Sequence, residues 1–297
     1  GMESQLVANH YPLHMVSIKA IRGKGLIHKV MASLLSVSAI FQSLYYIYKL
    51  KPDIAIAMGG FVSGPAGIAV WLARKPLLIH EQNAIAGYTN RILARFSSVV
   101  FQAFPKAFPA AINAETVGNP IRKQLASMAP PEQRYVARQG ALRVLVVGGS
   151  RGAQFINRVV LQSLQQYDAL DSLEIWHQTG VQELKAVEQA YQTMTNQIRV
   201  TAFIEDMISA YAWADLVICR AGALTVSEVA AVGVASIFIP FPSAVDDHQY
   251  HNACYLSDEG AALTYTQNTL DADVLLSLIK KFTHWVSCLS WCCSPCW

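Results

Sequence analysis

The sequence has few charged residues and no long run of charge of one sign. Asp, Glu, Lys and Arg make up 14% of the 297 residues, against about a quarter in an average soluble domain, and the net charge is +3. No five or six like charges follow one another, so nothing indicates a nucleic-acid partner. The apolar share is 53%. That balance favours buried parallel strands, a membrane-facing surface, or both.

Cysteine is also scarce in the body of the chain. Only Cys219 and Cys254 lie there, and the other four of the six cysteines fall in the last ten residues. A disulfide framework is therefore excluded for the body, which is typical of a cytosolic protein. Residues 1–10 lack the basic start and apolar run of a secretory signal.

One stretch, residues 30–48, carries no charge and approaches the length that a bilayer requires. Ser33, Ser36 and Gln42 dilute its hydrophobicity, and lysines flank both ends. Three interpretations remain: a spanning helix, a helix whose exposed flank meets a membrane surface, and an ordinary apolar domain helix. We favour the second, with the lysines near lipid phosphates.

Short apolar runs bounded by Gly and Pro alternate with helical patterns in two blocks. Such alternation predicts two α/β domains with parallel sheets and a ligand cleft between them. Residues 120–140, with Pro130-Pro131 and few large apolar residues, predict a connection between the domains. The expected strands are residues 53–58, 77–80, 98–102 and 115–117, then 142–147, 173–177, 199–203, 216–219 and 236–240. The expected helices include residues 88–96, 153–165, 181–194 and 224–232.

Two glycine-rich turns follow apolar strands, one in each block. They are residues 58–65 (MGGFVSGP) and 148–153 (GGSRGA). Glycine lets the backbone approach a ligand closely, and the following helix start favours an anion. Each turn fits either a phosphate site or a simple geometric need for glycine. The spacing is not the GxGxxG of a dinucleotide site.

Further polar groups follow other strands. In residues 220–228 (RAGALTVSE), Thr225 and Ser227 fit either helix capping or phosphate binding, and Glu228 fits either the helix dipole or two ribose hydroxyls. Residues 80–83 (HEQN) fit a ligand site or a structural cluster. Residues 246–249 (DDHQ) bring to mind a metal, which we do not predict because no further ligand lies nearby in the sequence.

Taken together and in this order, the segments resemble the MurG-type transferases of peptidoglycan synthesis, over residues 2–282. The segments that carry the resemblance are GGFVSGP, HEQNAIAG, VGNPIR, GGSRGA, FIEDM, CRAGALTVSE and DDHQYHNA. It implies the two-domain GT-B fold of α/β class, with two Rossmann-like domains. It also implies inverting transfer of N-acetylglucosamine from UDP-N-acetylglucosamine to undecaprenyl-diphosphate-linked N-acetylmuramyl-pentapeptide, converting lipid I to lipid II.

The resemblance also implies the site residues. Ile204 would meet uracil through its backbone, and Glu228 would hold the ribose. Ser150 and Arg122 would lie near the diphosphate, and Gln249 and Asn83 would contact the sugar. The other donor-binding residues would be Ala223, Leu224, Thr225, Val226 and Ser227, and the acceptor diphosphate would bind at Gly59, Gly60, Ser63 and Gly64.

Because helix ends and backbone amides stabilise the departing UDP in such enzymes, we expect no metal and no cofactor. The implied partners are UDP-N-acetylglucosamine, lipid I and an anionic membrane surface. The implied place is peripheral, on the cytoplasmic face of the bacterial inner membrane. The implied role is cell-wall synthesis, and through it cell shape and division.

The sequence departs from the family at both ends. The family's first strand and its glycine loop with a histidine, often the catalytic base, are not matched, which leaves His80 and Glu81 as weak candidates. Residues 285–297, rich in Cys and Trp, do not resemble the family, and a shifted reading frame or cloning artefact explains them better than a lone CxxC site. We expect domains at 1–120 and 141–284, a connection at 121–140 and this aberrant tail. Alternatives to an active transferase are an inactive chain that still binds UDP-sugar and a membrane-associated interaction protein.

Overall fold

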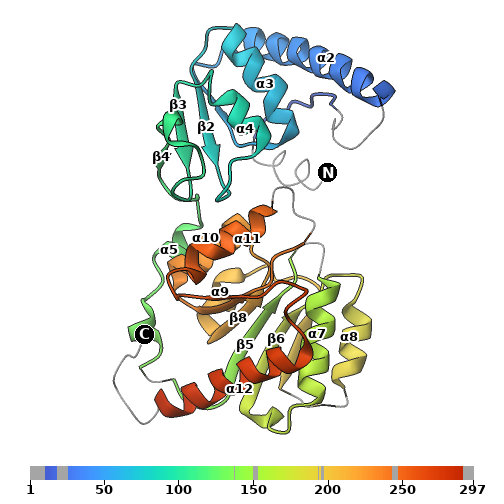
Figure 1. Cartoon of the computed structure of the whole chain (residues 1–297), viewed down its shortest axis with the longest axis vertical. Coiled ribbons are helices and arrows are strands. Elements are labelled where there is room, and N and C mark those ends of the chain that lie inside the picture. The colour runs from blue at the N-terminus through green and yellow to red at the C-terminus, as the bar shows by residue number, and fades with distance from the viewer. Residues whose placement is uncertain are drawn as a thin grey trace. The chain divides into compact units, whose positions relative to one another are not determined.

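The structure, a computed structural model, describes residues 11–18, 26–136, 138–149, 153–192, 194, 197–242 and 247–289. The chain forms two compact units, Gly1–Gly118 and Asn119–Trp297 (Figure 1). Each has its own parallel sheet and core, as the alternation of strands and helices predicts.

The first unit holds a four-stranded parallel sheet in the order β1-β2-β3-β4. Val70 on a helix and Leu77, Ile79 and Val100 on strands form its core with Leu93. The elements are α2 (Leu26–Leu50), β1 (Ala55–Ala57), α3 (Gly60–Leu72), β2 (Leu77–Glu81), α4 (Tyr88–Leu93), β3 (Val99–Gln102), a 3-10 turn (Ala110–Ile112) and β4 (Glu115–Thr116).

Glycine is required where α3 meets α4. A Cβ added at Gly67 would lie 2.7 Å from Cδ1 of Leu93, a side chain with no exposed surface. Real Cβ atoms essentially never come so close, so α3 packs on α4 only because residue 67 has no side chain.

Helix α2 packs along α3 and contains the uncharged stretch 30–48. Ala39 and Ser43 face inward, whereas Val37, Phe41, Tyr45 and Tyr48 are exposed and recur at helical spacing. In the described part of the chain, no helix is both long and apolar enough to cross a bilayer. The interpretation of residues 30–48 as a membrane-spanning helix is therefore not supported.

The second unit holds a six-stranded parallel sheet in the order β10-β9-β8-β5-β6-β7 (Figure 1). Its elements begin with the short helices α5 (Lys123–Ala126) and α6 (Pro131–Arg134). They continue with β5 (Leu142–Val147), α7 (Gln154–Gln165), a 3-10 turn (Leu170–Ser172), β6 (Leu173–Gln178), α8 (Leu184–Tyr191), β7 (Ile198–Thr201), α9 (Met207–Trp213), β8 (Leu216–Cys219), α10 (Ala223–Val232), β9 (Ala235–Phe238), α11 (His248–Ser257), β10 (Leu263–Thr264) and α12 (Ala272–Leu289).

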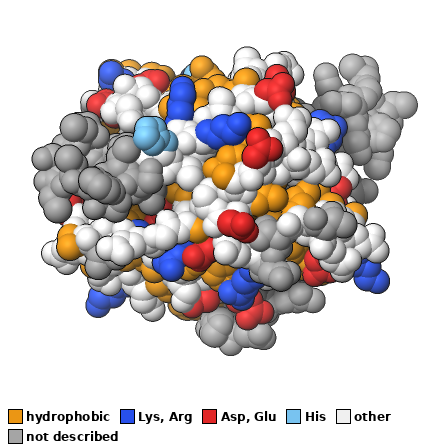
Figure 2. All heavy atoms as spheres, turned by 90° about the horizontal axis from the view of Figure 1, so that it is seen from below, with side chains coloured by type: hydrophobic (Ala, Val, Ile, Leu, Met, Phe, Trp, Pro, Cys, Tyr) orange, Lys and Arg blue, Asp and Glu red, His pale blue; other side chains and the backbone are white. Residues whose placement is uncertain are grey.

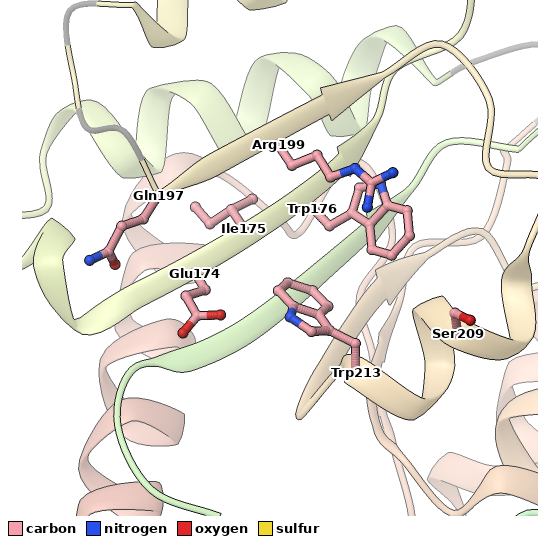
Figure 3. A pocket seen from close by; sticks show the side chains of 7 residues that line it. All are labelled: Glu174, Ile175, Trp176, Gln197, Arg199, Ser209 and Trp213. Carbon is pink, nitrogen blue, oxygen red and sulfur yellow. The ribbon is translucent and has the colours of Figure 1, made fainter.

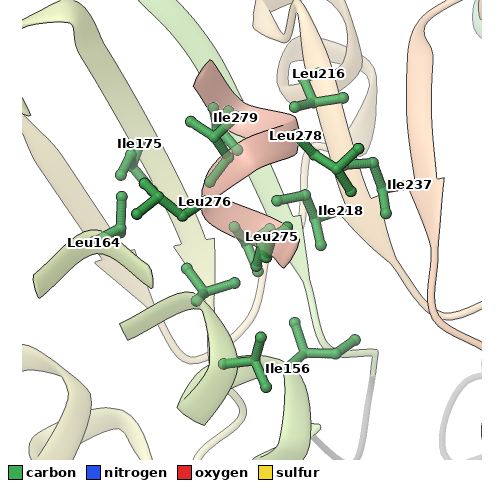
Figure 4. Close-up of a cluster of buried hydrophobic side chains, with 14 of the residues drawn as sticks. Ile156, Leu164, Ile175, Leu216, Ile218, Ile237, Leu275, Leu276, Leu278 and Ile279 are labelled. Atoms are coloured by element: carbon green, nitrogen blue, oxygen red, sulfur yellow. The ribbon is translucent and has the colours of Figure 1, made fainter. Parts of the chain in front are cut away.

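The main core of this unit lies between the sheet and helices α7, α8 and α12. Leu275 and Ile279 of α12 point toward the strands that carry Ile175 and Ile218 (Figure 4). Leu145 and Val217 alternate to the opposite face of the sheet, where they are fully buried on the side of α9 and α10. Strands buried on both faces explain the continuous apolar runs in the sequence.

The segment predicted as a connection is attached to the second unit. Arg138 forms two hydrogen bonds from Nε and one from Nη2 to the carboxylate of Asp215, at 2.7 to 3.1 Å. Arg134 donates to the carbonyl of Val232, and Tyr135 to that of Ala214. Arg134, Tyr135 and Arg138 thus fix this segment to α10 and to the residues just before β8.

Element boundaries differ from the sequence prediction by a few residues. The helix predicted over 181–194 spans only Leu184–Tyr191, and the strand predicted over 199–203 is Ile198–Thr201. Helices α11 and α12 were not predicted. On the face shown in Figure 2, acidic and basic side chains are interspersed, with no large area of one sign.

Candidate active site

The polar candidates of the second unit gather where β5 and β8 end side by side. Val147 pairs with Cys219, so the turn after β5 and the start of α10 after β8 leave the sheet together. From β5 the chain continues to β6 on one side, while β8 lies on the other. Such a switch point outside the carboxyl ends of parallel strands is where open α/β sheets bind ligands.

Helix α10 presents its first turn at this point. Gly222 is the N-cap residue, and its first helical hydrogen bond runs from the Val226 N–H to the Gly222 carbonyl at 2.9 Å. The preceding amides are left to bind an anion, which the helix dipole also favours. Val226 is fully buried, so it can serve a ligand only through its backbone, whereas the Leu224 side chain is half exposed.

Side-chain capping, one of the two interpretations of this segment, is not found. No side chain caps α10 at Gly222. The Ser227 hydroxyl instead donates to the Ala223 carbonyl at 3.0 Å and accepts from Nδ2 of Asn119, also at 3.0 Å. Ser227 is the fifth residue of α10, and a serine at such a position satisfies its hydroxyl on the carbonyl one turn earlier, which is why it does not cap the helix start.

Glu228, one turn into α10, is half buried. Its Oε2 accepts a hydrogen bond from the Tyr211 hydroxyl at 3.2 Å. Burial raises the pKa of the Glu228 carboxyl, and the bond from Tyr211 and the charge of Arg122 partly oppose that rise. Among the described residues no hydrogen bond reaches Oε1, so this oxygen can accept from a ligand.

Arg122 lies close to this group. Its positive charge lowers the pKa of Glu228, of Tyr211 and of Asp206, although other causes dominate each shift. Asp206 caps α9 by accepting from the N–H groups of Ile208 and Ser209. The structure therefore brings together Arg122, Glu228 and the segment that contains Ile204.

Ile204 itself is buried, between β7 and α9. Within the described part of the chain no hydrogen bond engages its backbone N–H or carbonyl. The backbone N–H and carbonyl of Ile204 could therefore pair with a planar base that carries both an acceptor and a donor. Ser150, predicted near the diphosphate, lies outside the described residues, and Asp246 does too.

Gln249 in the first turn of α11 also belongs to this side of the unit. Its Oε1 accepts from the Phe241 N–H at 2.9 Å, and among the described residues no hydrogen bond is made by its amide nitrogen. Arg220 donates to the carbonyls of Ile239 and Pro240 and covers the ring of Phe241 at 5.3 Å. Among the described residues, no group of three His, Cys, Asp or Glu side chains could hold a metal ion.

The first unit presents the other glycine turn. Gly59 caps α3 with φ of +86°, Gly60 follows with φ of +80°, and the Ser63 hydroxyl donates to the Gly59 carbonyl. A Cβ at Gly59 would lie 3.2 Å from Nδ2 of Asn90, so glycine is favoured there by both space and conformation. Gly64 packs loosely beside Thr89.

Next to this turn, the two weak candidates for a proton acceptor already have partners. Glu81 is buried, and its carboxylate accepts from the N–H groups of Asn83 and Gly87 and from the amides of Asn83 and Asn90, at 2.8 to 3.1 Å. His80 contacts the Gly118 carbonyl through Nε2 at 2.9 Å and Gln82 through Nδ1 at 3.2 Å. These contacts order the loop, and the geometry does not favour either residue as a base.

A cavity of about 600 Å³ elsewhere in the second unit contains none of the predicted site residues. Trp176 and Trp213 meet there edge to face at 5.9 Å, and the Arg199 guanidinium covers Trp176 at 3.9 Å (Figure 3). Sequence reasoning missed other residues that shape the candidate site: Asn119, Gln178, Tyr211 and Arg220. Of these, Asn119 and Arg220 lie within segments that carry the family resemblance.

Comparisons with known proteins agree with this arrangement. The glycosyltransferase family 28 N-terminal domain matches residues 1–102, and the family 28 C-terminal domain matches residues 143–285. The UDP-N-acetylglucosamine–N-acetylmuramyl-(pentapeptide) pyrophosphoryl-undecaprenol N-acetylglucosamine transferase of Coxiella burnetii (strain RSA 493 / Nine Mile phase I) is 46% identical over 284 residues, which are 96% of this chain and 79% of that protein. The protein of the same name from Marinobacter nauticus is 47% identical over 281 residues, 94% of this chain and 77% of its own.

Solved structures show the same relationship. The crystal structure of Acinetobacter baumannii MurG has a TM-score of 0.81 and 40% identity, covering 96% of this chain and 82% of that one. The glycosyltransferase of kitacinnamycin shares the fold alone, at a TM-score of 0.66 and 14% identity. The chain has the two-domain fold that the sequence predicts, and it belongs to glycosyltransferase family 28 and, within it, to the MurG-type transferases.

Proposed function

We propose that the chain transfers N-acetylglucosamine from UDP-N-acetylglucosamine to undecaprenyl-diphosphate-linked N-acetylmuramyl-pentapeptide, with inversion, and so converts lipid I to lipid II. The relatives at 46% and 47% identity carry the name of this reaction. The observation that carries the proposal in the structure is the meeting of Glu228, Tyr211 and Arg122 beside the open first turn of α10.

The donor would bind at the switch point of the second unit. Glu228 Oε1 accepts the ribose hydroxyls, and the backbone of Ile204 meets the uracil. The amides of Ala223, Leu224 and Thr225 receive the diphosphate. Arg122 and the helix dipole stabilise the negative charge that develops on the departing UDP.

The sugar and the acceptor would involve other groups. The amide nitrogen of Gln249, which has no hydrogen-bond partner among the described residues, suits a sugar hydroxyl. The turn at Gly59 and Gly60 leads into thirteen residues of helix, α3, whose N-terminal amides suit the acceptor's diphosphate. Asn83, predicted at the sugar, is held by Glu81 through both its N–H and its amide.

We further propose that α2 rests on an anionic membrane surface. Its exposed Val37, Phe41, Tyr45 and Tyr48 form an apolar stripe, and the Lys49 ammonium lies 5.8 Å from the Tyr45 ring. Aromatic side chains beside a lysine suit the boundary between lipid tails and phosphates. On this proposal the chain would act peripherally, on the cytoplasmic face of the bacterial inner membrane, and would serve cell-wall synthesis, cell shape and division.

A second candidate is donor binding without turnover. It is favoured by the contacts that occupy His80 and Glu81, the two residues of the first unit considered as proton acceptors.

One experiment separates the two candidates. Calorimetric titration with UDP-N-acetylglucosamine, with UDP-glucose as comparison, reports donor binding. Turnover of a soluble lipid I analogue reports transfer. Selective donor binding with turnover is the expected result, and binding without turnover would favour the second candidate. A folded chain that binds neither nucleotide sugar would contradict both.

A further inference from the structure

Gln178, the last residue of β6, directs its side chain at the turn that follows β5. The side chain is buried, with 3% of the residue exposed. Its Oε1 accepts from the Gly149 N–H at 3.2 Å, and its Nε2 donates to the Gly149 carbonyl at 3.0 Å. One carboxamide therefore pairs with both backbone groups of Gly149, as a neighbouring strand would.

The same amide reaches a third backbone group. Nε2 also lies 3.4 Å from the carbonyl of Ala202, which accepts from the Gly180 N–H at 3.1 Å. Ala202 stands directly after β7 and two residues before Ile204. Gln178 thus joins the glycine turn after β5 to the segment after β7, two loops that are far apart in sequence.

The sheet does not need these contacts. The backbone of β6 is paired with β5 and β7 over its length, including Gln178 opposite Val147 and Thr201. An apolar side chain would cost less to bury than a carboxamide unless the loop contacts matter. Gly149 has φ of +83°, and a Cβ there would meet nothing within 4 Å, so glycine is favoured at this position by backbone conformation and not by packing.

We propose that Gln178 is a positioning residue for the donor. It fixes the Gly149 peptide just after β5, beside the start of α10, and so sets the backbone next to which the diphosphate would lie. The inference rests on the proposed donor site in the second unit. It predicts that loss of the carboxamide weakens binding of the phosphate part of the donor far more than binding of the nucleoside, because only the weakest of the three contacts involves the segment near Ile204.

The test compares UDP with uridine on the full chain by titration calorimetry. For Gln178→Met, which keeps the length of the side chain, the dissociation constant for UDP should rise about tenfold, the usual effect of losing one or two net hydrogen bonds. The constant for uridine should change less than about twofold. Gln178→Asn keeps an amide but is one methylene too short for both Gly149 contacts, and it should show the same selectivity even if the methionine variant folds poorly.

Gln102→Met is the matched control. Gln102 is as buried as Gln178 and uses the same two atoms, donating to Thr116 Oγ1 at 2.9 Å and accepting from the Phe108 N–H at 3.2 Å, but within the first unit. It should change thermal stability without changing either dissociation constant.

The outcomes separate the two levels of the proposal. Selective loss of UDP binding in both Gln178 variants supports the inference. If the unaltered chain binds UDP and the Gln178 variants bind it equally well, or lose UDP and uridine alike, the inference is wrong while the donor site stands. If the unaltered chain binds no UDP, the donor site is wrong and the inference falls with it.

Discussion

The hydroxyl of Tyr211 donates a hydrogen bond to Oε2 of Glu228 across 3.2 Å, and the two residues come from different helices, α9 and α10. Tyr211 is almost fully buried, and burial raises the pKa of its hydroxyl, so it remains a donor at every physiological pH. The bond occupies one carboxylate oxygen of Glu228, and among the described residues no hydrogen bond reaches the other. Its consequences for binding and for stability can be measured separately.

The first prediction concerns the ribose. Glu228→Gln and Glu228→Ala should weaken UDP binding by about 1–3 kcal/mol, because ribose hydroxyls lose their charged acceptor. The measurement is calorimetric titration with UDP and with 2′-deoxy-UDP. The penalty should be smaller for the deoxy nucleotide. Glu174→Gln, a partly exposed position at the start of β6, is the control and should leave both affinities unchanged.

The second prediction concerns pH. Because burial raises the pKa of Glu228, the carboxylate that accepts the ribose is lost at a higher pH than for an ordinary glutamate. UDP affinity should therefore begin to fall, on acidification, above the usual glutamate range. Tyr211→Phe removes a bond that lowers this pKa and should move the fall to higher pH still. An affinity profile that Tyr211→Phe leaves in place would contradict the assignment.

The same pKa shift has a consequence for stability with the opposite sign. A raised pKa means that the folded state prefers protonated Glu228, so its contribution to the free energy of unfolding is favourable below the unfolded pKa and is lost as pH rises through the folded one. Glu228→Gln should therefore stabilise the second unit at neutral pH relative to the unaltered chain. Urea unfolding at pH 5 and pH 8 measures the difference, which should grow with pH.

The third prediction concerns the ion pair of Arg138 and Asp215, whose side chains are 11% and 7% exposed. Asp215→Asn should destabilise the second unit by about 3–5 kcal/mol, because it leaves a nearly buried guanidinium without its counter-charge. Glu174→Gln breaks the Arg143–Glu174 pair, which is about one third exposed, and should cost less than about 1 kcal/mol. Equal midpoints in urea for the two variants would refute the distinction.

The fourth prediction concerns Gly67. Gly67→Ala should destabilise the first unit by about 1–3 kcal/mol, because the new methyl group would overlap Leu93. Gly64→Ala, in the same helix, places its methyl group 3.5 Å from Thr89, an ordinary contact, and should be neutral or slightly stabilising. Thermal unfolding followed by circular dichroism compares them, and a milder effect at Gly67 than at Gly64 would show that α3 can shift.

The fifth prediction concerns α2. Replacing Phe41, Tyr45 and Tyr48 together by serine should lower binding to vesicles that contain phosphatidylglycerol, because about 2 kcal/mol or more of apolar contact is lost for each deeply inserted ring. Flotation measures the bound fraction. Val136→Ser with Val181→Ser removes two exposed apolar side chains from the second unit and should have no effect. Retention of binding by the triple variant would exclude this face.

Much of the fold follows from the sequence because its strands are continuous apolar runs. Residues 142–147 and 216–219 are almost entirely apolar, which indicates strands buried on both faces of a sheet, and the glycines that follow them indicate turns. The motif segments likewise predict which loops meet at the switch point. In contrast, residues 181–183 were predicted as the start of a polar helix, but they form a turn, and α8 begins only at Leu184.

The contacts that shape the candidate site were beyond sequence reasoning. Tyr211 and Glu228 are 17 residues apart, and Asn119 and Ser227 are 108 apart. No local pattern encodes such pairs. Ser227 shows where a local pattern misleads. A hydroxyl near a helix start suggests capping, but the Ser227 hydroxyl donates to the Ala223 carbonyl one turn earlier.

The segment between Asn119 and Arg138, which is attached to the second unit, also determines how that unit can be studied alone. Asn119 donates to the Ala223 carbonyl in the first turn of α10, and Arg134 donates to the Val232 carbonyl in its last turn. Pro131 packs against Gly233, where an added Cβ would lie 2.6 Å from Cγ of Pro131. A fragment that starts at Leu142, at the beginning of β5, would lose all three contacts that support α10, the helix proposed to receive the diphosphate. A fragment meant to fold as the second unit alone should therefore begin at Asn119, directly after Gly118, and not at Leu142.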